Sequence, residues 1–418
     1  MIKINIPNNN INERKYIIDI LFNEFLGLEY NIEYCSNSYE IILKNRKQLT
    51  IKDSFFNKYP KDLEYLKLEN IPAKIEDLDI FAGSFFMLTR WEEYVNKTRD
   101  SHNRFPVIES LAYRQGFLDR PIVNEYVEQL KSKLLELDSS LQFKEREYQL
   151  VLTHDVDHIY KWDTSKNFFK HLLGDLLLRK SFVIFLSSIG KYINVKIGRL
   201  KDPFDTFDYL MDISESIKVK SYFFFMAKGI TKYDNNYITS KKHVLNLVKK
   251  IKDRGHYIGI HPTYNAYNIK EQLKAEKLEL ESNFDTFISF GREHYLRFEI
   301  PTTWQVWEDN GMSWDSTLGY ADREGFRCGV CYEYSVFNIL TRTKLKLKEK
   351  PLIVMEESVI RRENISSEDM EKIIEDLILK VKKYRGEFVF LWHNSSFNTE
   401  FWSQYRKVYK KVLLRSID

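Results

Sequence analysis

The chain is poor in cysteine, in long apolar runs and in net charge, and each shortage excludes a class of protein. Three cysteines, Cys35, Cys328 and Cys331, occur among 418 residues, which suits a reducing compartment and a fold not built on disulfides. No run of 18 or more apolar residues is present, so we expect no transmembrane segment. A net charge of +4 against 64 basic and 60 acidic residues gives no reason to expect nucleic acid as a partner.

The N-terminal third of the chain carries no metal-type cluster. Its only histidine is His102, which we expect to be a surface or hydrogen-bonded residue. Helical spacing at 77–94 and 117–135 is followed by a polar stretch at 136–147, our predicted boundary. We therefore predict an N-terminal α+β domain of unknown role at 1–145 and a second domain at 146–418. The first residues lack the apolar core of a secretory signal, so we expect a cytoplasmic protein.

The stretch YQLVLTHDVDH, Tyr148 to His158, combines a buried strand with a cluster of ionisable groups. Four such groups at the end of an apolar strand are costly to bury unless a partner such as a divalent cation compensates them. Asp155 and Asp157 share one face because strand side chains repeat every second residue. One carboxylate is then able to bind a metal while the other stays free as a base. An Asp-rich capping loop is the alternative for an isolated pair of this kind.

From residue 202 onward, strand and helix patterns alternate. Strands are predicted at 221–227, 256–261, 313–318, 352–359 and 387–392, with helices at 204–217, 240–254, 271–288, 302–310 and 368–384. Repeated units of this kind are typical of a parallel α/β barrel, whose sites lie at the C-terminal ends of the strands. Polar residues at five strand ends are therefore expected to converge, namely Asp155 with Asp157, His261, Arg297, Asp315 and His393.

Three further features have two interpretations each. Lys and Arg residues flank apolar 182–189 within 162–200, which indicates either an amphipathic hairpin or a contact with a membrane surface. Four tryptophans form either a sugar-stacking platform or core packing, and these are Trp162, Trp304, Trp307 and Trp314. The spacing of Cys328 and Cys331 lacks a second such pair and is interpreted as structural.

These motifs resemble those of the polysaccharide deacetylase family, the NodB-homology type of carbohydrate esterase, over about 149–394. THDVD resembles the first motif in its DxD variant, and GHYIGIH, ending at His261, resembles the second. Arg297 with Pro301 is similar to a loosened third motif, Asp315 falls at the fourth, and LWH, ending at His393, resembles the fifth. The segments FMLTRWEEY, RFP and GFLDRPIVNEY resemble an uncharacterised module that precedes such domains.

The resemblance implies a distorted (β/α) barrel and a metal-dependent removal of an N-acetyl group from a sugar or glycan. Asp157 and His261 would hold a divalent cation, most simply zinc. Asp155 would be the general base and His393 the general acid. Asp315 would orient His393, and Arg297 would keep Asp155 ionised.

The second motif departs from the family pattern at its second histidine, where this chain has Asn265. Either Asn265 or water completes the metal site, or His158 or His294 reaches in, or the metal is lost. His154 and His256 are interpreted as packing or hydrogen-bonding residues. Two alternative functions remain: hydrolysis of another C–N bond, such as that of a cyclic imide, and a decayed barrel that binds glycan without catalysis.

Overall fold

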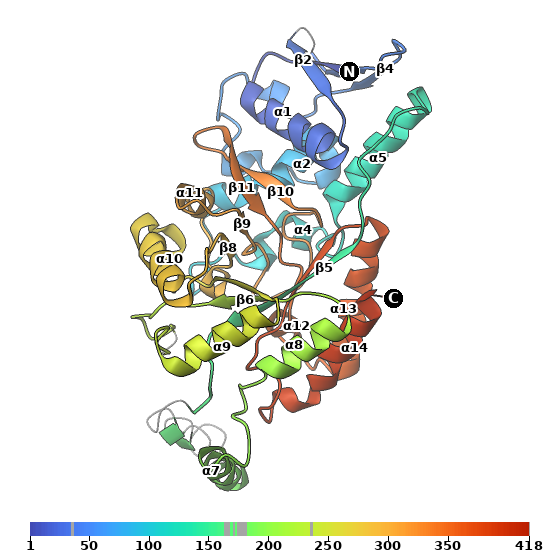
Figure 1. Cartoon of the computed structure of the whole chain (residues 1–418). Coiled ribbons are helices and arrows are strands. Elements are labelled where there is room, and N and C mark those ends of the chain that lie inside the picture. The colour runs from blue at the N-terminus through green and yellow to red at the C-terminus, as the bar shows by residue number, and fades with distance from the viewer. Residues whose placement is uncertain (35–36, 163–167, 170–171, 174–181, 235–236, 418) are drawn as a thin grey trace.

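The computed structural model describes residues 1–34, 37–162, 168–169, 172–173, 182–234 and 237–417. Two sheets organise these residues, a small one near the N-terminus and a large one in the middle of the molecule (Figure 1). Cys35 and most of 163–181 lie outside the described residues.

The N-terminal sheet has four strands in the order β2-β1-β3-β4. These are β1 (Ile2–Ile6), β2 (Tyr30–Tyr34), β3 (Tyr39–Ile42) and β4 (Gln48–Ile51). β1 pairs parallel to β2 and antiparallel to β3, which pairs antiparallel to β4. The helices of this part are α1 (Ile11–Ile18), α2 (Ile80–Thr89), α3 (Trp91–Val95), α4 (Leu111–Arg114) and α5 (Ile122–Leu137). The mixture of strands and helices agrees with the α+β prediction.

The large sheet has nine strands in the order β10-β11-β9-β8-β7-β6-β5-β13-β12. They are β5 (Gln149–Val156), β6 (Tyr222–Phe225), β7 (Tyr257–Ile260), β8 (Phe290–Gly291), β9 (Trp314–Asp315), β10 (Tyr334–Asn338), β11 (Thr343–Glu349), β12 (Val354–Met355) and β13 (Glu387–Leu391). Every pairing is parallel except that of β10 with β11. The C-terminal ends of the parallel strands therefore lie at one edge of the sheet, as the alternating pattern predicts.

This topology agrees only in part with the predicted closed barrel. β10 and β12 are the two edge strands, and no pairing joins them within the described part of the chain, so closure stays a prediction. The antiparallel pair β10 and β11 was not predicted. The expected strand at 352–359 is also shorter, because residues 356–359 form helix α12 (Glu356–Val359).

The helices around the large sheet follow the predicted spacing closely. They are α8 (Phe207–Ser216), α9 (Lys242–Asp253), α10 (Lys270–Phe284), α11 (Thr302–Asp309), α13 (Ser367–Lys383) and α14 (Arg406–Ile417). A capping box starts α13, in which the Ser366 hydroxyl accepts from the Asp369 amide and the Asp369 carboxylate accepts from the Ser366 amide. Such local signals explain why the sequence places these helices well.

One contiguous apolar core runs through both sheets and their helices. At the junction, Glu93 of α3 forms buried ion pairs with Arg90 at 2.9 Å and with Arg327 at 2.6 Å. The Tyr334 hydroxyl of β10 donates to the Leu88 carbonyl of α2 at 2.9 Å. These contacts join the two parts of the chain, and a domain boundary at 145 stays a prediction.

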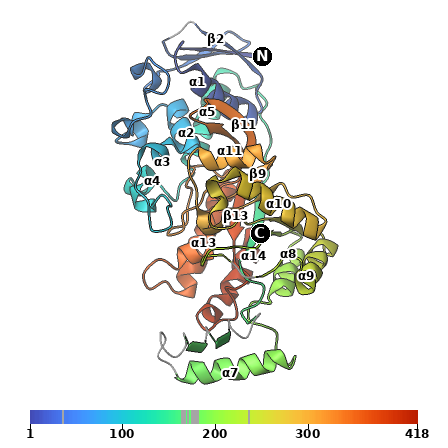
Figure 2. The ribbon, with the colours of Figure 1, turned by 90° about the vertical axis from the view of Figure 1, so that its left-hand side faces the viewer.

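Helix α7 (Phe182–Lys196) stands apart from the body, at the end of the molecule opposite the N-terminal sheet (Figures 1 and 2). Among the described helices, none has the length and apolar character required to cross a bilayer.

Candidate functional site

A cavity of about 260 Å³ lies at the C-terminal ends of the parallel strands. Its walls include Asp155 and Asp157 from the end of β5, His261 from the end of β7, His294 after β8, and His393 after β13. Four of these five were predicted from the sequence to meet at one mouth. A larger groove of about 970 Å³ lies beside α5, and no histidine lines it.

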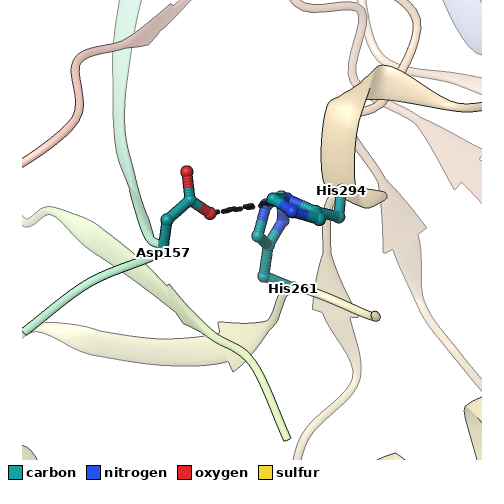
Figure 3. A group of neighbouring side chains, drawn as sticks. All are labelled: Asp157, His261 and His294. Atoms are coloured by element: carbon teal, nitrogen blue, oxygen red, sulfur yellow. Dashed lines mark hydrogen bonds and ion pairs between the residues drawn. The ribbon is translucent and has the colours of Figure 1, made fainter. Parts of the chain in front are cut away.

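Asp157, His261 and His294 bring three potential metal ligands together (Figure 3). The Oδ1 atom of Asp157 lies 3.3 Å from Nε2 of His261 and 3.5 Å from Nδ1 of His294. The two ring nitrogens are 2.9 Å apart. Four-coordinate zinc with bonds of about 2.0–2.1 Å requires ligand atoms about 3.3–3.4 Å from one another. The observed spacing is therefore close to that of a cation site.

Hydrogen bonds on the far side of each imidazole orient the lone pairs toward the centre of this cluster. Nδ1 of His261 lies 2.6 Å from the Arg292 carbonyl oxygen, and Nε2 of His294 lies 2.9 Å from that of Tyr233. A carbonyl oxygen only accepts, so these nitrogens carry the hydrogens. In the neutral rings, the inward nitrogens then present lone pairs, as does the carboxylate oxygen of Asp157. Three lone pairs that face each other repel unless a cation or an extra proton lies between them, and the backbone contacts are typical of metal-binding histidines.

The pKa values agree with this arrangement. Burial opposes the charge of Asp157, but His294 and His261 outweigh it and hold the pKa of this carboxyl well below its usual range. Burial lowers the pKa of His294 to about 4, so this ring is neutral at pH 7. Burial also acts against a charged His261, but Asp155 and Asp157 raise its pKa. A proton therefore competes with a cation for the His261 lone pair.

Asn265, the predicted third ligand, lies outside the cluster. It is exposed, and its side-chain oxygen accepts from Nη1 of Arg297 at 3.3 Å. The turn after β7 directs it away, because the Thr263 amide is bound to Glu276 at 2.8 Å and the Tyr264 amide to Asp234 at 2.7 Å. His294, one of the alternatives raised from the sequence, takes this place. His158 lines the cavity but is not in the group of three.

Arg292, and not the predicted Arg297, pairs with Asp155. Nη1 of Arg292 donates to Oδ1 of Asp155 at 2.9 Å and to the Thr153 hydroxyl at 3.0 Å, with both charged groups buried. The prediction failed because it placed the end of the strand too late. β8 ends at Gly291, so Arg292 is the first side chain beyond it. The signal was available, since Arg292 directly follows the short apolar pattern of β8.

Arg297 has a different place in the structure. Its guanidinium lies 4.0 Å from the ring centre of Tyr264 and 4.1 Å from that of Tyr267, and Nε donates to the His102 carbonyl at 2.9 Å. Tyr295 and Leu296, with φ of 61° and 53°, turn the chain before Arg297. Left-handed backbone at two consecutive non-glycine residues is strained and often marks a functional site.

Glu356, and not the predicted Asp315, holds His393. Nδ1 of His393 lies 2.7 Å from Oε1 of Glu356, while its Nε2 lies 3.8 Å from Oδ2 of Asp157. Burial alone would lower the pKa of His393, but Glu356, assisted by Glu357 and Asp157, raises it well above its usual value. The carboxylate of Glu356 therefore favours the protonated form of His393.

Strand order explains why Asp315 does not reach His393. β12, which precedes Glu356, is the neighbour of β13, whereas four strands separate β9 from β13. Asp315 is instead fully buried and accepts from the Thr317 hydroxyl at 2.5 Å. Burial raises its pKa to about 6. No contact joins it to His393 within the described ranges.

The mouth of the cavity is lined by tyrosine and histidine rather than by the four tryptophans considered for sugar stacking. The Tyr295 ring lies 4.6 Å from His102 and 5.6 Å from Tyr233, and all three residues line the cavity. Trp304 and Trp307 are completely buried, and their indole N–H groups donate to Glu349 and Glu293. The four tryptophans do not line the cavity, so the packing alternative fits them better.

The other candidate residues have structural roles. His154 is buried with Nδ1 2.7 Å from the Trp392 carbonyl oxygen, and Nδ1 of His256 accepts from the Ser221 amide at 3.0 Å. Cys328 and Cys331 are buried and free, and burial raises the pKa of the Cys328 thiol to about 12. His102 is hydrogen-bonded, as one of its two expected roles has it, through Nδ1 to the Tyr264 hydroxyl at 3.1 Å. Its place in the cavity wall was not expected, because a single histidine far from the motifs gives no sequence signal.

Comparison with known proteins gives distant matches. Residues 2–139 match the family described as "Family of unknown function (DUF7033)", and no curated protein matches the chain. A "putative polysaccharide deacetylase" from Mycobacterium smegmatis has 10% sequence identity and a TM-score of 0.41, with 66% of this chain and 85% of that chain covered. A CE4 family pseudoenzyme from Bacillus anthracis has 10% identity and a TM-score of 0.28, covering 64% and 62%. A mutant of it with restored enzymatic activity has 11% identity and a TM-score of 0.30, with 64% of each chain covered.

Proposed function

We propose that the chain is a metal-dependent hydrolase that removes an N-acetyl group from a sugar or glycan precursor. The observation that carries the proposal is the set of three lone-pair atoms from Asp157, His261 and His294. Their far-side hydrogen bonds direct the three lone pairs toward one centre, and their spacing of 2.9–3.5 Å is close to that of the ligands of a four-coordinate zinc ion. A donor set of two imidazoles and one carboxylate favours zinc among common divalent ions.

The cation would supply a Lewis acid that polarises the acetamide carbonyl and acidifies water. Asp155 would take the proton from the attacking water. Its Oδ1 atom is occupied by Arg292, which holds the carboxylate in one orientation beside the cluster. Its Oδ2 atom lies 3.9 Å from Nδ1 of His261. A base positioned in this way contributes through orientation as well as basicity.

His393 would act as the general acid that protonates the leaving amine. Its Nδ1 is bound to Glu356, so Nε2 is the nitrogen that remains to donate toward the cavity. The negative charge of Glu356 stabilises the imidazolium, as a buried carboxylate does in other acid–base pairs. Asp155 and His393 would thus act on one bound amide, the first removing a proton and the second supplying one.

The proposal is tested by metal content together with acetate release. The purified protein should bind about one zinc per chain and release acetate from an N-acetylated sugar. Asp155→Asn should retain the metal and lose turnover, whereas Asp157→Ala should lose both. Equal metal loss in the two variants would show that the roles are wrongly assigned. Turnover of cyclic imides in place of acetylated sugars would identify the alternative hydrolase, and absence of both metal and turnover would indicate a decayed barrel.

We also propose that α7 contacts an anionic lipid surface while the enzyme works in the cytoplasm. One stripe of this helix carries Leu186 and Ile193, and Ile197 follows directly after its C-terminal end. Each of these three side chains is more than 50% exposed. Lys191 and Lys196 of the same helix are also exposed. Apolar and basic groups together are typical of helices that lie on anionic membranes.

This contact is tested by sedimentation with vesicles. The protein should sediment with phosphatidylglycerol vesicles and not with phosphatidylcholine vesicles, and the double change of Leu186 and Ile193 to serine should abolish binding. Leu278→Ser is the matched control, because Leu278 is a 55% exposed leucine on α10. Equal binding to both vesicles, or loss of binding in the control, would contradict the proposal. Cell fractionation checks the cytoplasmic location.

A further inference from the structure

One wall of the cavity comes from the N-terminal part of the chain, through His102 and Arg104. The loop that carries them is firmly attached to the segment after β8. Nη1 of Arg104 donates to the Tyr295 carbonyl at 3.1 Å, and Nε of Arg297 donates to the His102 carbonyl at 2.9 Å. Within the loop, the Asp100 carboxylate accepts from the amides of His102 and Arg104 at 2.8 Å and 2.9 Å. The first 145 residues therefore build part of the site.

A second wall carries an arginine that lacks a partner. Arg361 follows α12, lines the cavity and is exposed. Its guanidinium makes no hydrogen bond or ion pair with any residue that the structure describes. Arg361 and Arg104 are also close enough to His102 to help burial lower the pKa of that ring. Positive charge thus reaches the mouth from two separate segments.

Two carboxyl groups, those of Asp100 and Glu357, lie near these arginines. Asp100 forms an ion pair with Arg104 at 2.7 Å. This ion pair does not involve Arg361. Glu357, four residues before Arg361, lines the same cavity; burial raises the pKa of its carboxyl, and the charge of Arg361 acts to lower it. An arginine without a partner at the mouth of a pocket is well suited to bind phosphate, whose oxygens match the planar guanidinium.

The size of the cavity restricts the rest of the ligand. A volume of about 260 Å³ accommodates roughly one sugar ring. The rings of Tyr295 and His102 line the cavity 4.6 Å apart, and aromatic rings suit the C–H surface of a sugar.

We infer that the cavity takes a single N-acetylated sugar unit that carries a phosphate group, and not an internal unit of a neutral polysaccharide. Arg361 binds the phosphate at a mouth that Arg104 also lines, while Tyr295 and His102 contact the ring. This inference rests on the proposed function and names its substrate class. The phosphate belongs to a free sugar phosphate, a nucleotide-linked sugar or a lipid-linked sugar, since all three share the same chemistry.

Calorimetric titration of the full-length, zinc-loaded Asp155→Asn variant measures binding without turnover. N-Acetylglucosamine 1-phosphate should bind about tenfold more tightly than N-acetylglucosamine at low salt, and added salt should reduce the difference. Arg361→Gln in the same background should remove the preference and leave zinc content and the affinity for the neutral sugar unchanged. Arg362→Gln is the matched control, because Arg362 is bound to Glu324 and does not line the cavity.

Three outcomes would overturn the inference: equal affinity for the two sugars, a preference that survives Arg361→Gln, or tighter binding of a chitin tetrasaccharide than of the monosaccharide. Comparison of the sugar 1-phosphate with a uridine diphosphate-linked sugar identifies whether a monoester or a diester is preferred, and either supports the shared chemistry. A phosphate preference without acetate release from any substrate would refute the proposed function and leave the anion site standing. Acetate release without the preference would refute only the inference.

Discussion

Replacement of His294 should remove the metal, whereas replacement of Asn265 should not. His294 supplies one of three ligand atoms, and its loss leaves only Asp157 and His261. Two protein ligands form no stable structural or catalytic zinc site, so we expect His294→Ala to retain less than about 0.2 zinc per chain after dialysis. Asn265→Ala should keep the wild-type content, because Asn265 is exposed and bound to Arg297.

The size of the effect follows from linkage between binding and folding. At a free zinc concentration about 1,000 times the dissociation constant, a bound ion stabilises the fold by about 4.1 kcal/mol. An unfolding entropy of about 2.1 cal/mol/K per residue gives about 0.9 kcal/mol/K for 418 residues. Zinc should therefore raise the unfolding midpoint by about 5 °C in the wild type and in Asn265→Ala, and by nothing measurable in His294→Ala.

Differential scanning fluorimetry with zinc and with a chelator measures this rise within each variant. The comparison removes the cost of losing the buried imidazole itself, because that cost affects both scans of the variant equally. A zinc-dependent rise of wild-type size in His294→Ala would refute the assignment of the three ligands. Loss of the zinc-dependent rise in the unfolding midpoint of Asn265→Ala would instead support Asp157, His261 and Asn265 as the ligands, as predicted from the sequence.

Three further changes probe the acid, the junction and the sheet. Glu356→Gln removes the charge that keeps His393 protonated, so kcat should fall by about 10²–10⁴ with metal content unchanged; an unaltered kcat would exclude His393 as the acid. Burial opposes ionisation of Glu93, but its two arginine partners lower its pKa from 4.5 to about 2, so its stabilisation is present above pH 4.5 and is lost as the pH falls toward 2. Glu93→Gln should therefore cost about 3 kcal/mol at pH 7 and weaken the acid dependence in urea titrations, and an unchanged midpoint would contradict this. In Gly291→Ala, the new Cβ would lie 1.8 Å from a backbone carbonyl oxygen of β7, so metal content and thermal stability should both fall, whereas Gly190→Ala, with nothing within 4 Å, should leave both intact.

The sequence predicted the helices and parallel strands of the large sheet because their signals are local. The apolar run near the start of β5 and the capping box of α13 are both recognised from neighbouring residues. β10 and β11 were missed, since they form an antiparallel pair within a chain otherwise dominated by alternating units. The strand expected through residue 359 ended early because α12 begins at Glu356.

By itself the sequence determined that Asp155, Asp157, His261 and His393 would meet, because side chains at the C-terminal ends of parallel strands share one edge of the sheet. Only the tertiary structure decided their partners. His294 and Arg292 reach the site because β8 ends at Gly291 and a strained turn follows it. Glu356 reaches His393 because β12 and β13 are neighbours in the sheet. A strand end is a local property of the chain, whereas the neighbour of a strand and the direction of a turn depend on residues far apart in sequence.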